Sequence, residues 1–100
     1  MSANNDNSVA RDAVVLSTKD NVATALRALQ PDQVVSLETP SSRVEVTVIE
    51  AIPRCHKFAI DAIAAGQPVL KYGEVIGVAS QAVVAGSHVH VHNITSLRAR

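Results

Sequence analysis

Three of the four histidines in this chain, His88, His90 and His92, fall within five residues near its end. They alternate with Val89 and Val91, and a period of two residues is typical of a half-buried β-strand. One face of such a strand would carry imidazoles, which bind metal ions and transfer protons, and the other face would carry valines. The sequence therefore predicts a strand over residues 88–92 that faces a polar site.

An extended strand limits how these imidazoles can combine. Because a strand rises about 3.3 Å per residue, neighbouring histidines on one face lie about 7 Å apart and the outer two about 13 Å apart. Two adjacent imidazoles can reach one ion at about 2.1 Å each, but His88 and His92 are too far apart to share it. We expect two ligands from this strand, with His88 and His90 preferred, or one of them together with His56. The competing interpretation is a solvated row of histidines opposite buried valines.

The chain contains three similar segments, and the third leads into this strand. They are residues 25–32, 59–66 and 79–86. Each has alanines three residues apart, then an aliphatic residue, then a Gly or Asp, with a valine at a fixed offset. The hydrophobic spacing after Asp20 would by itself predict a helix capped by that residue. Because Gly and Asp tolerate a positive φ, the comparison instead favours a strand, one helical turn, a tight bend and a second strand in every copy.

The rest of the chain also indicates short strands. Valines alternate with polar residues over residues 44–48, an apolar run covers residues 13–16, and residues 69–76 have the form of a hairpin around Gly73. We expect a disordered arm over residues 1–11, a domain over residues 12–95 and a polar tail over residues 96–100. Many short strands with frequent turn signals predict a compact all-β fold.

Composition narrows the possible partners. Nine basic and nine acidic residues cancel, and no lysine- or arginine-rich run is present, which argues against nucleic-acid binding. The aromatic fraction of 2% provides little surface for stacking bases or lining a large apolar cavity. No apolar stretch approaches the roughly 20 residues of a membrane span. Because the single cysteine, Cys55, cannot form an intramolecular disulfide, we expect a reduced, cytoplasmic protein.

Four motifs in order identify a family resemblance. They are His56-Lys57, the segment at 62–66, the segment at 71–77, and the histidine run at 88–93. In this order they resemble the small subunit of the altronate and galactarate dehydratase family, and the same module is similar to the sulfolactate sulfo-lyase small subunit. The resemblance covers most of residues 13–95. One departure is Cys55, because this family usually has glycine there, and a cysteine is strained if the position needs a positive φ.

The resemblance implies a SAF domain with the β-clip fold, acting with a separate large dehydratase subunit. Such enzymes remove water from a sugar acid to give a 2-keto-3-deoxy acid, commonly with Fe²⁺ or another divalent metal such as Mn²⁺. The chemistry needs a base beside the carboxylate and an acid or metal that helps hydroxide leave. This sequence has no cluster of carboxylates, so we expect it to supply part of a site, inactive by itself.

The candidate residues are assigned by role under this resemblance. Lysines suit a substrate carboxylate, and a tyrosine can donate a hydrogen bond to it. The plainer interpretation leaves the lysines solvated, the tyrosine packed on the sheet and the cysteine inert. The assignments are His56 and Lys71 as catalytic residues, Lys57, Tyr72 and His92 as substrate-binding residues, and His88 and His90 as metal ligands.

Two other functions remain open at this stage. The domain could be a binding module that recognises a carbohydrate or carboxylate without chemistry, or its leaving group could be sulfite from sulfolactate. The exposed edges of a small all-β domain could also pair with a second copy to give a homodimer or a higher oligomer.

Overall fold

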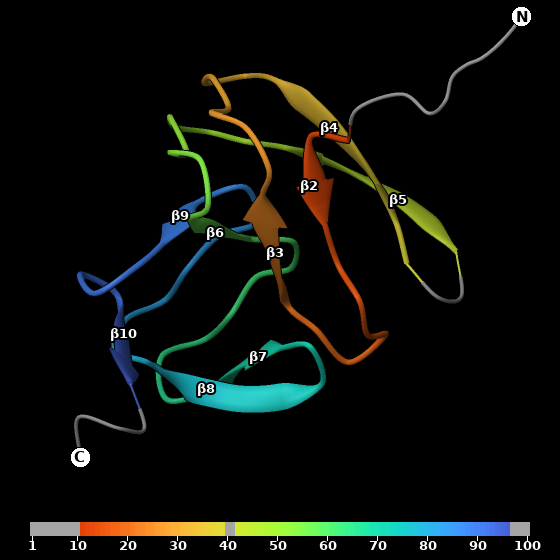
Figure 1. The fold of residues 1–100 in the computed structure, drawn as a ribbon. Coiled ribbons are helices and arrows are strands. Elements are labelled where there is room, and N and C mark those ends of the chain that lie inside the picture. Colours follow the sequence, from red (N-terminus) through yellow and green to blue (C-terminus); the bar gives the residue numbers. More distant parts are fainter. Residues whose placement is uncertain (1–10, 40–41, 97–100) are drawn as a thin grey trace, which may run out of the picture.

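The computed structural model describes residues 11–39 and 42–96, and this part of the chain forms strands and turns without a helix (Figure 1). The predicted all-β fold is therefore confirmed. The described strands are β2 (Ala13–Val14), β3 (Val22–Ala25), β4 (Val34–Glu38), β5 (Arg43–Thr47), β6 (Lys57–Ala59), β7 (Pro68–Lys71), β8 (Glu74–Ala79), β9 (His88–Val89) and β10 (Ile94–Ser96). Nothing in the described part has the length and apolarity of a membrane-crossing helix.

These strands form three small antiparallel sheets. A four-stranded sheet has the order β2-β3-β6-β9, a three-stranded sheet has the order β10-β8-β7, and β4 and β5 form a hairpin. In Figure 1 the four-stranded sheet occupies the middle of the molecule, with the β4–β5 hairpin above it and the β7–β8 hairpin below. The central strand β6 has both faces buried, because Phe58 belongs to one apolar cluster and Ala59 to the other.

The three repeated segments share one structure, but the expectation of a helical turn in each is wrong. Each contains a β-turn closed by a backbone hydrogen bond, as in the 3.0 Å contact from the Gln67 amide to the Ala64 carbonyl. The third turn residue has a positive φ, of 71° at Asp32, 88° at Gly66 and 90° at Gly86. A single residue with positive φ reverses the chain in four residues, which leaves no room for a helical turn.

A fourth turn of the same kind was missed in the sequence. The amide of His56 donates to the carbonyl of Pro53 at 3.0 Å, and Cys55 takes the third turn position with a φ of 73°. This copy lacks the alanine spacing and the Gly or Asp of the others, so the pattern did not reveal it. The strain expected for Cys55 is present, because a cysteine occupies a conformation that favours glycine.

The β7–β8 hairpin has the predicted turn. Tyr72 and Gly73 have φ values of 56° and 79°, which is the pattern of a two-residue hairpin turn. The buried carboxylate of Asp20 accepts hydrogen bonds from the amides of Tyr72 and Gly73 at 2.8 and 2.7 Å. Asp20 therefore does not cap a helix, in agreement with the strand preferred for the segment that follows it, and its oxygens stabilise a turn about fifty residues further along the chain.

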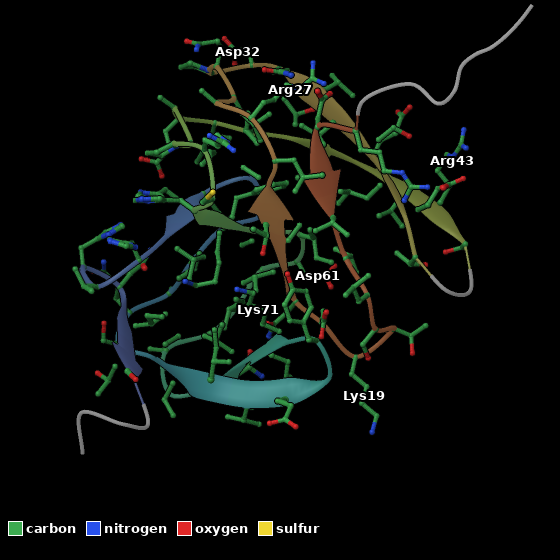
Figure 2. The ribbon with its side chains drawn as sticks, in the orientation of Figure 1. Lys19, Arg27, Asp32, Arg43, Asp61 and Lys71 are labelled. Carbon is green, nitrogen blue, oxygen red and sulfur yellow. The ribbon has the colours of Figure 1, made fainter. Side chains whose placement is uncertain are left out.

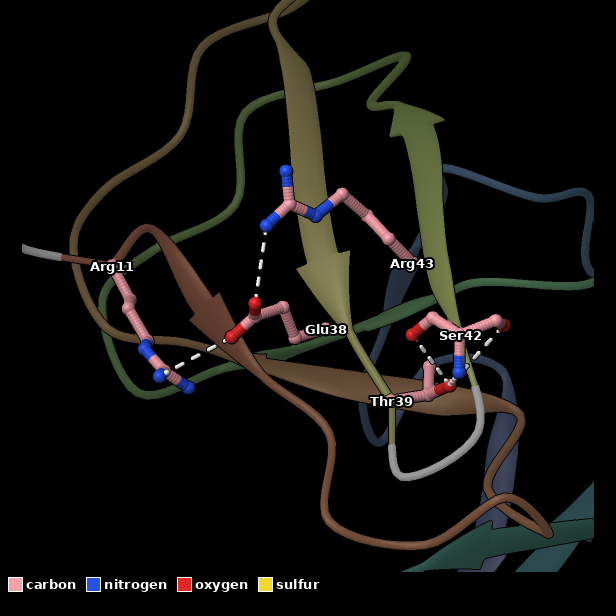
Figure 3. Close-up of polar contacts among 5 residues, drawn as sticks. All are labelled: Arg11, Glu38, Thr39, Ser42 and Arg43. Carbon is pink, nitrogen blue, oxygen red and sulfur yellow. Dashed lines mark hydrogen bonds and ion pairs between the residues drawn. The ribbon is translucent and has the colours of Figure 1, made fainter.

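The ends of the chain are only partly described. Residues 1–10 of the expected arm and 97–100 of the expected tail lie outside the described residues, and Ser96 ends β10. Arg11 forms an ion pair with Glu38 at 3.3 Å, and Arg43 contacts the same carboxylate at 3.1 Å (Figure 3). All three side chains are exposed, so these pairs add little to stability.

The histidine strand is shorter than predicted. β9 contains only His88 and Val89, and it pairs with β6 through Phe58 and Lys57. Residues 90–93 then form a turn, and Val91 is 82% exposed. The expected strand over residues 88–92 with both valines buried is therefore wrong beyond Val89, since the chain bends where the alternation predicted an extended backbone.

Candidate functional site

Two paired strands bring three imidazoles together, from His56, His88 and His90, which we call the histidine cluster. His56 lies between the Cys55 turn and β6, His88 begins β9, and the pairing of β6 with β9 sets them side by side. One nitrogen from each of the three rings lies within 4.8 Å of the other two. From the sequence we expected His56 as a catalytic residue and as an alternative metal ligand, and the structure places its ring among those of His88 and His90.

The rings of the cluster stack nearly parallel. The centroid distances are 4.5 Å for His56 and His90, 5.0 Å for His56 and His88, and 5.3 Å for His88 and His90. Nδ1 of His56 and Nε2 of His88 are 2.8 Å apart, so one of them donates a hydrogen bond to the other. His92 lies beside the cluster, with its ring tilted by 38° and 5.4 Å from that of His88. The 13 Å separation expected for His88 and His92 is wrong because the chain turns between them.

Asn93 stabilises that turn, and its residue type and position did not mark it as functional in the sequence. Its buried side-chain oxygen accepts a hydrogen bond from the amide of His90 at 2.9 Å, and its side-chain nitrogen donates to the carbonyl of His88 at 2.8 Å. The sequence signal was an asparagine at the end of the alternation, a residue type that favours turns. Asn93 therefore holds the backbone of two cluster histidines at once.

The surroundings of the cluster favour neutral imidazoles. Partial burial, followed by the charges of His56, His90 and His92, lowers the pKa of His88, while Glu50 acts in the opposite direction. Glu50 also accepts a hydrogen bond from the His88 amide at 3.0 Å. Partial burial lowers the pKa of His90 as well, with further contributions from His56, Lys57 and His92. A neutral imidazole has a free ring nitrogen, which is the form that binds metal.

One lysine lies beside the cluster, and a second lies close to the first. Lys57 follows His56 directly, and burial together with the charge of Lys71 lowers the pKa of Lys57. Lys71 lies between the β7–β8 hairpin and the four-stranded sheet (Figure 2), and its Nζ is 4.9 Å from the ring centroid of Tyr72. Neither lysine takes part in the ion pairs found within residues 11–39 and 42–96. Tyr72 is 46% exposed, and its ring is in contact with Lys71.

The donor set fits a divalent metal ion. Two imidazole nitrogens that bind one ion at about 2.0–2.1 Å lie about 3.0–3.4 Å from each other. The 2.8 Å contact of His56 with His88 is already near this spacing, and rotation of a half-buried ring can close the wider pairs. Imidazole ligands suit zinc, copper, iron and nickel. The Fe²⁺ implied by the family resemblance therefore has a suitable set of three residues in this chain.

A separate cavity of about 400 Å³ does not suit a sugar acid. It lies between the loop before β3, the end of the β4–β5 hairpin and the residues after β6. Its ionisable lining consists of the acidic residues Asp20, Glu45 and Asp61, which would repel an anionic substrate. The histidine cluster, with Lys57 beside it, is the better candidate.

Comparison with known proteins places this chain in a family. The family described as "Altronate/galactarate dehydratase SAF domain" matches residues 11–97. The chain belongs to this family. It is 45% identical to altronate dehydratase of Escherichia coli (strain K12) over 74% of the chain and 14% of that enzyme. It is 36% identical to altronate dehydratase of Bacillus subtilis (strain 168) over 80% of the chain and 15% of that enzyme. This SAF domain thus spans about one seventh of the length of these relatives.

A smaller relative is similar over most of its own length. The chain is 40% identical to the (2R)-sulfolactate sulfo-lyase subunit alpha of Paracoccus pantotrophus, over 58% of the chain and 87% of that subunit. The resemblance inferred from the four motifs is confirmed, and the domain is related to dehydratases and other lyases.

Proposed function

We propose that this chain is the small subunit of a sugar-acid hydro-lyase that acts with a separate large dehydratase subunit. The observation that carries the proposal is the histidine cluster, with Lys57 beside it and Lys71 close to Lys57, in a member of the dehydratase SAF family. The product would be a 2-keto-3-deoxy acid. An exposed, free Cys55 suits a reducing compartment, and we propose a cytoplasmic location.

The residues of this chain would divide the chemistry among them. Fe²⁺, or Mn²⁺ in its place, would be held by His56, His88 and His90 and would supply Lewis-acid assistance to the departing hydroxide. Lys57 would bind the substrate carboxylate, because it is a half-buried cation without an acidic partner in the described ion pairs. If His56 binds the metal, its nitrogen is not free for the catalytic role that the sequence assigned to it. Lys71 or a group of the large subunit would then accept the proton from the substrate.

Tyr72 and His92 would bind substrate at the edges of the same region. Tyr72 is in contact with Lys71 and has a partly exposed ring, and His92 lies next to His88. The tyrosine hydroxyl can donate to a carboxylate or hydroxyl oxygen, and an imidazole can donate or accept. Together these groups would line one side of a substrate, and the large subunit would supply the other side.

A second candidate is the small subunit of a sulfolactate sulfo-lyase. The supporting observation is that the matched region makes up 87% of the Paracoccus pantotrophus alpha subunit, so a chain of this kind exists there as a named subunit. In that case the leaving group would be sulfite, and the same lysines would face the anionic groups of sulfolactate. A non-catalytic module that binds a carbohydrate or carboxylate would use the same residues without forming product.

The test is reconstitution of the purified chain with a large dehydratase subunit of this family. Altronate, galactarate and sulfolactate are offered to the chain alone, to the large subunit alone and to the mixture, each with Fe²⁺ or Mn²⁺. We expect product from a sugar acid in the mixture only, measured as 2-keto acid. Sulfite from sulfolactate would support the second candidate, and substrate binding without product would support the binding module. Full turnover by this chain alone would contradict the division of labour.

A further inference from the structure

We propose that this chain forms a homodimer in which the outer edge of β5 pairs antiparallel with the same edge of a second copy. In this dimer Arg43 of each chain lies opposite Glu45 of the other, and the two β4–β5 hairpins join into one four-stranded sheet. The pairing rests on the backbone and the charges of this hairpin, and it is independent of the function proposed above.

β5 lies at the edge of its sheet. It pairs with β4 on one side and, within residues 11–39 and 42–96, with no strand on the other. The end of the hairpin extends away from the four-stranded sheet, and Figure 2 shows Arg43 at its outer margin, on the opposite side of the view from β9 (Figure 1). An exposed strand edge of this kind is a template for pairing with another chain.

The hydrogen-bond pattern of the hairpin shows which groups face this edge. The amide of Thr39 donates to the carbonyl of Ser42 at 2.7 Å, so these two residues form a hydrogen-bonded pair next to the loop. Because such pairs alternate in an antiparallel ladder, Val44 bonds to β4, and the amides and carbonyls of Arg43 and Glu45 point outward. These outward groups make no backbone hydrogen bond to any part of the chain that the structure describes.

The other end of the same edge is covered. The carbonyl of Thr47 is the next outward group, and it lies so close to Gly86 that a Cβ added there would overlap it. Beyond β5, the amide of Ile49 donates to the carbonyl of Gly86 at 3.0 Å. Residues 43–45 are therefore the part of β5 that can accept a second strand.

The charges on these residues select one register for a symmetric pair. A two-fold axis at Arg43 would set two guanidinium groups opposite each other, and an axis at Glu45 would do the same with two carboxylates, which is destabilising. An axis at Val44 sets Arg43 opposite Glu45 of the second copy on both sides of the axis. It also pairs the two Val44 side chains, each 36% exposed in the single chain. Each pair of Arg43 with Glu45 would exchange both of its backbone hydrogen bonds.

The contact is small, so the dimer should be weak. Pairing over residues 43–45 buries far less than the ~1,200 Å² that marks the lower limit of stable interfaces. The ion pairs are exposed, and salt screens them. We therefore expect a dimer that is populated at millimolar chain concentration and low ionic strength and that dissociates on dilution or on addition of salt.

The first experiment measures the mass of the purified 100-residue chain by sedimentation equilibrium from micromolar to millimolar concentration, without metal or substrate. The mass should rise from that of a monomer towards that of a dimer, and the amide resonances of Arg43 and Glu45 should shift over the same range. A chain that stays monomeric at millimolar concentration would overturn the proposal. Shifts of these two amides only on addition of a large dehydratase subunit would assign the edge to that subunit and would also overturn the homodimer.

Charge reversal tests the register. Arg43→Glu and Glu45→Arg each set like charges opposite each other, so each variant alone should dimerise at least ~3-fold more weakly than the wild type. An equimolar mixture of the two variants restores opposite charges at both positions and should recover the wild-type affinity as a heterodimer. The matched control is Glu74→Arg, which reverses an exposed charge on β8 away from this edge and should leave dimerisation unchanged.

The mixture also guards against loss of the fold, because unfolded variants cannot restore the dimer. A mixture that stays monomeric while the wild-type chain dimerises would overturn the pairing of Arg43 with Glu45. An equal loss of affinity in Glu74→Arg would place the contact elsewhere on the surface and would overturn it as well. Since no metal, substrate or large subunit enters these mass measurements, their outcome is independent of product formation by the reconstituted enzyme.

Discussion

Gly66 and Gly86 occupy equivalent turns with nearly equal φ values of 88° and 90°, but their surroundings differ. A Cβ added at Gly66 would meet nothing within 4 Å. A Cβ added at Gly86 would overlap the carbonyl oxygen of Thr47 and lie 3.2 Å from Cα of Val48, both of which are backbone atoms. The substitutions Gly66→Ala and Gly86→Ala therefore separate the effect of a positive φ from that of close backbone packing.

The expected losses in the free energy of unfolding follow from the positive φ and from the close backbone packing. A left-handed conformation costs an L-residue about 1–2 kcal/mol, so Gly66→Ala should lower the free energy of unfolding by that amount. Gly86→Ala adds an overpacking contribution of about 1–3 kcal/mol, because the β5 backbone must move, which gives about 2–5 kcal/mol in all. Since the Gly86 turn leads directly to His88, the second variant should also weaken Fe²⁺ binding.

The assay is urea unfolding of the metal-free chain, followed by circular dichroism, with the Tm as a second readout. Each kcal/mol should lower the Tm by about 4–8 °C for a domain of this size. Equal losses in the two variants would refute the close approach of Gly86 to Thr47. No loss in Gly66→Ala would refute the positive φ assigned to this turn.

Three further predictions use the same protein. Cys55→Gly should raise the Tm by about 4–8 °C, because it relieves about 1 kcal/mol of strain at a φ of 73°, while Cys55→Ser should leave it unchanged. Asn93→Ala should weaken Fe²⁺ binding by ~10–100-fold, because the backbones of His88 and His90 lose their shared partner; an unchanged affinity would show that Asn93 does not position them. The metal-free chain should lose stability as pH falls from about 7 to 5. Burial and neighbouring imidazoles lower the pKa of His88 and His90, so the unfolded state, with histidine pKa values near 6.5, binds more protons over this range. A free energy of unfolding that rose with acidification in urea titrations would contradict this assignment.

The fold class was predictable because local signals agreed with one another. Turn residues such as Gly66 and Gly86, and the alternation over residues 44–48, favour short strands joined by tight bends. The fourth turn escaped detection because Cys55 occupies a conformation that its residue type does not suggest. Only its contacts with the rest of the fold hold it there, and such contacts are invisible in a local pattern.

The residue types of the candidate site were predicted from the sequence, but its geometry was not. The alternation of His88, Val89 and His90 predicted a straight strand, and the limit of two ligands followed from that straightness. The bend depends on the Asn93 side chain, which satisfies backbone groups of both His88 and His90. The position of His56 beside His88 depends on the pairing of strands from segments 32 residues apart in the sequence. Hydrophobic periodicity cannot specify such a long-range contact.

The central claim is that the histidine cluster is one side of a lyase site completed by a large subunit. The most direct measurement is the initial rate of 2-keto acid formation by the reconstituted enzyme with wild-type chain, His56→Ala and the exposed control Arg43→Ala, each shown to bind the large subunit. We predict that Arg43→Ala retains the wild-type rate and that His56→Ala loses it by at least ~100-fold in kcat/KM, about 2.7 kcal/mol of transition-state stabilisation. A His56→Ala enzyme that assembles and turns over at the wild-type rate would contradict the account.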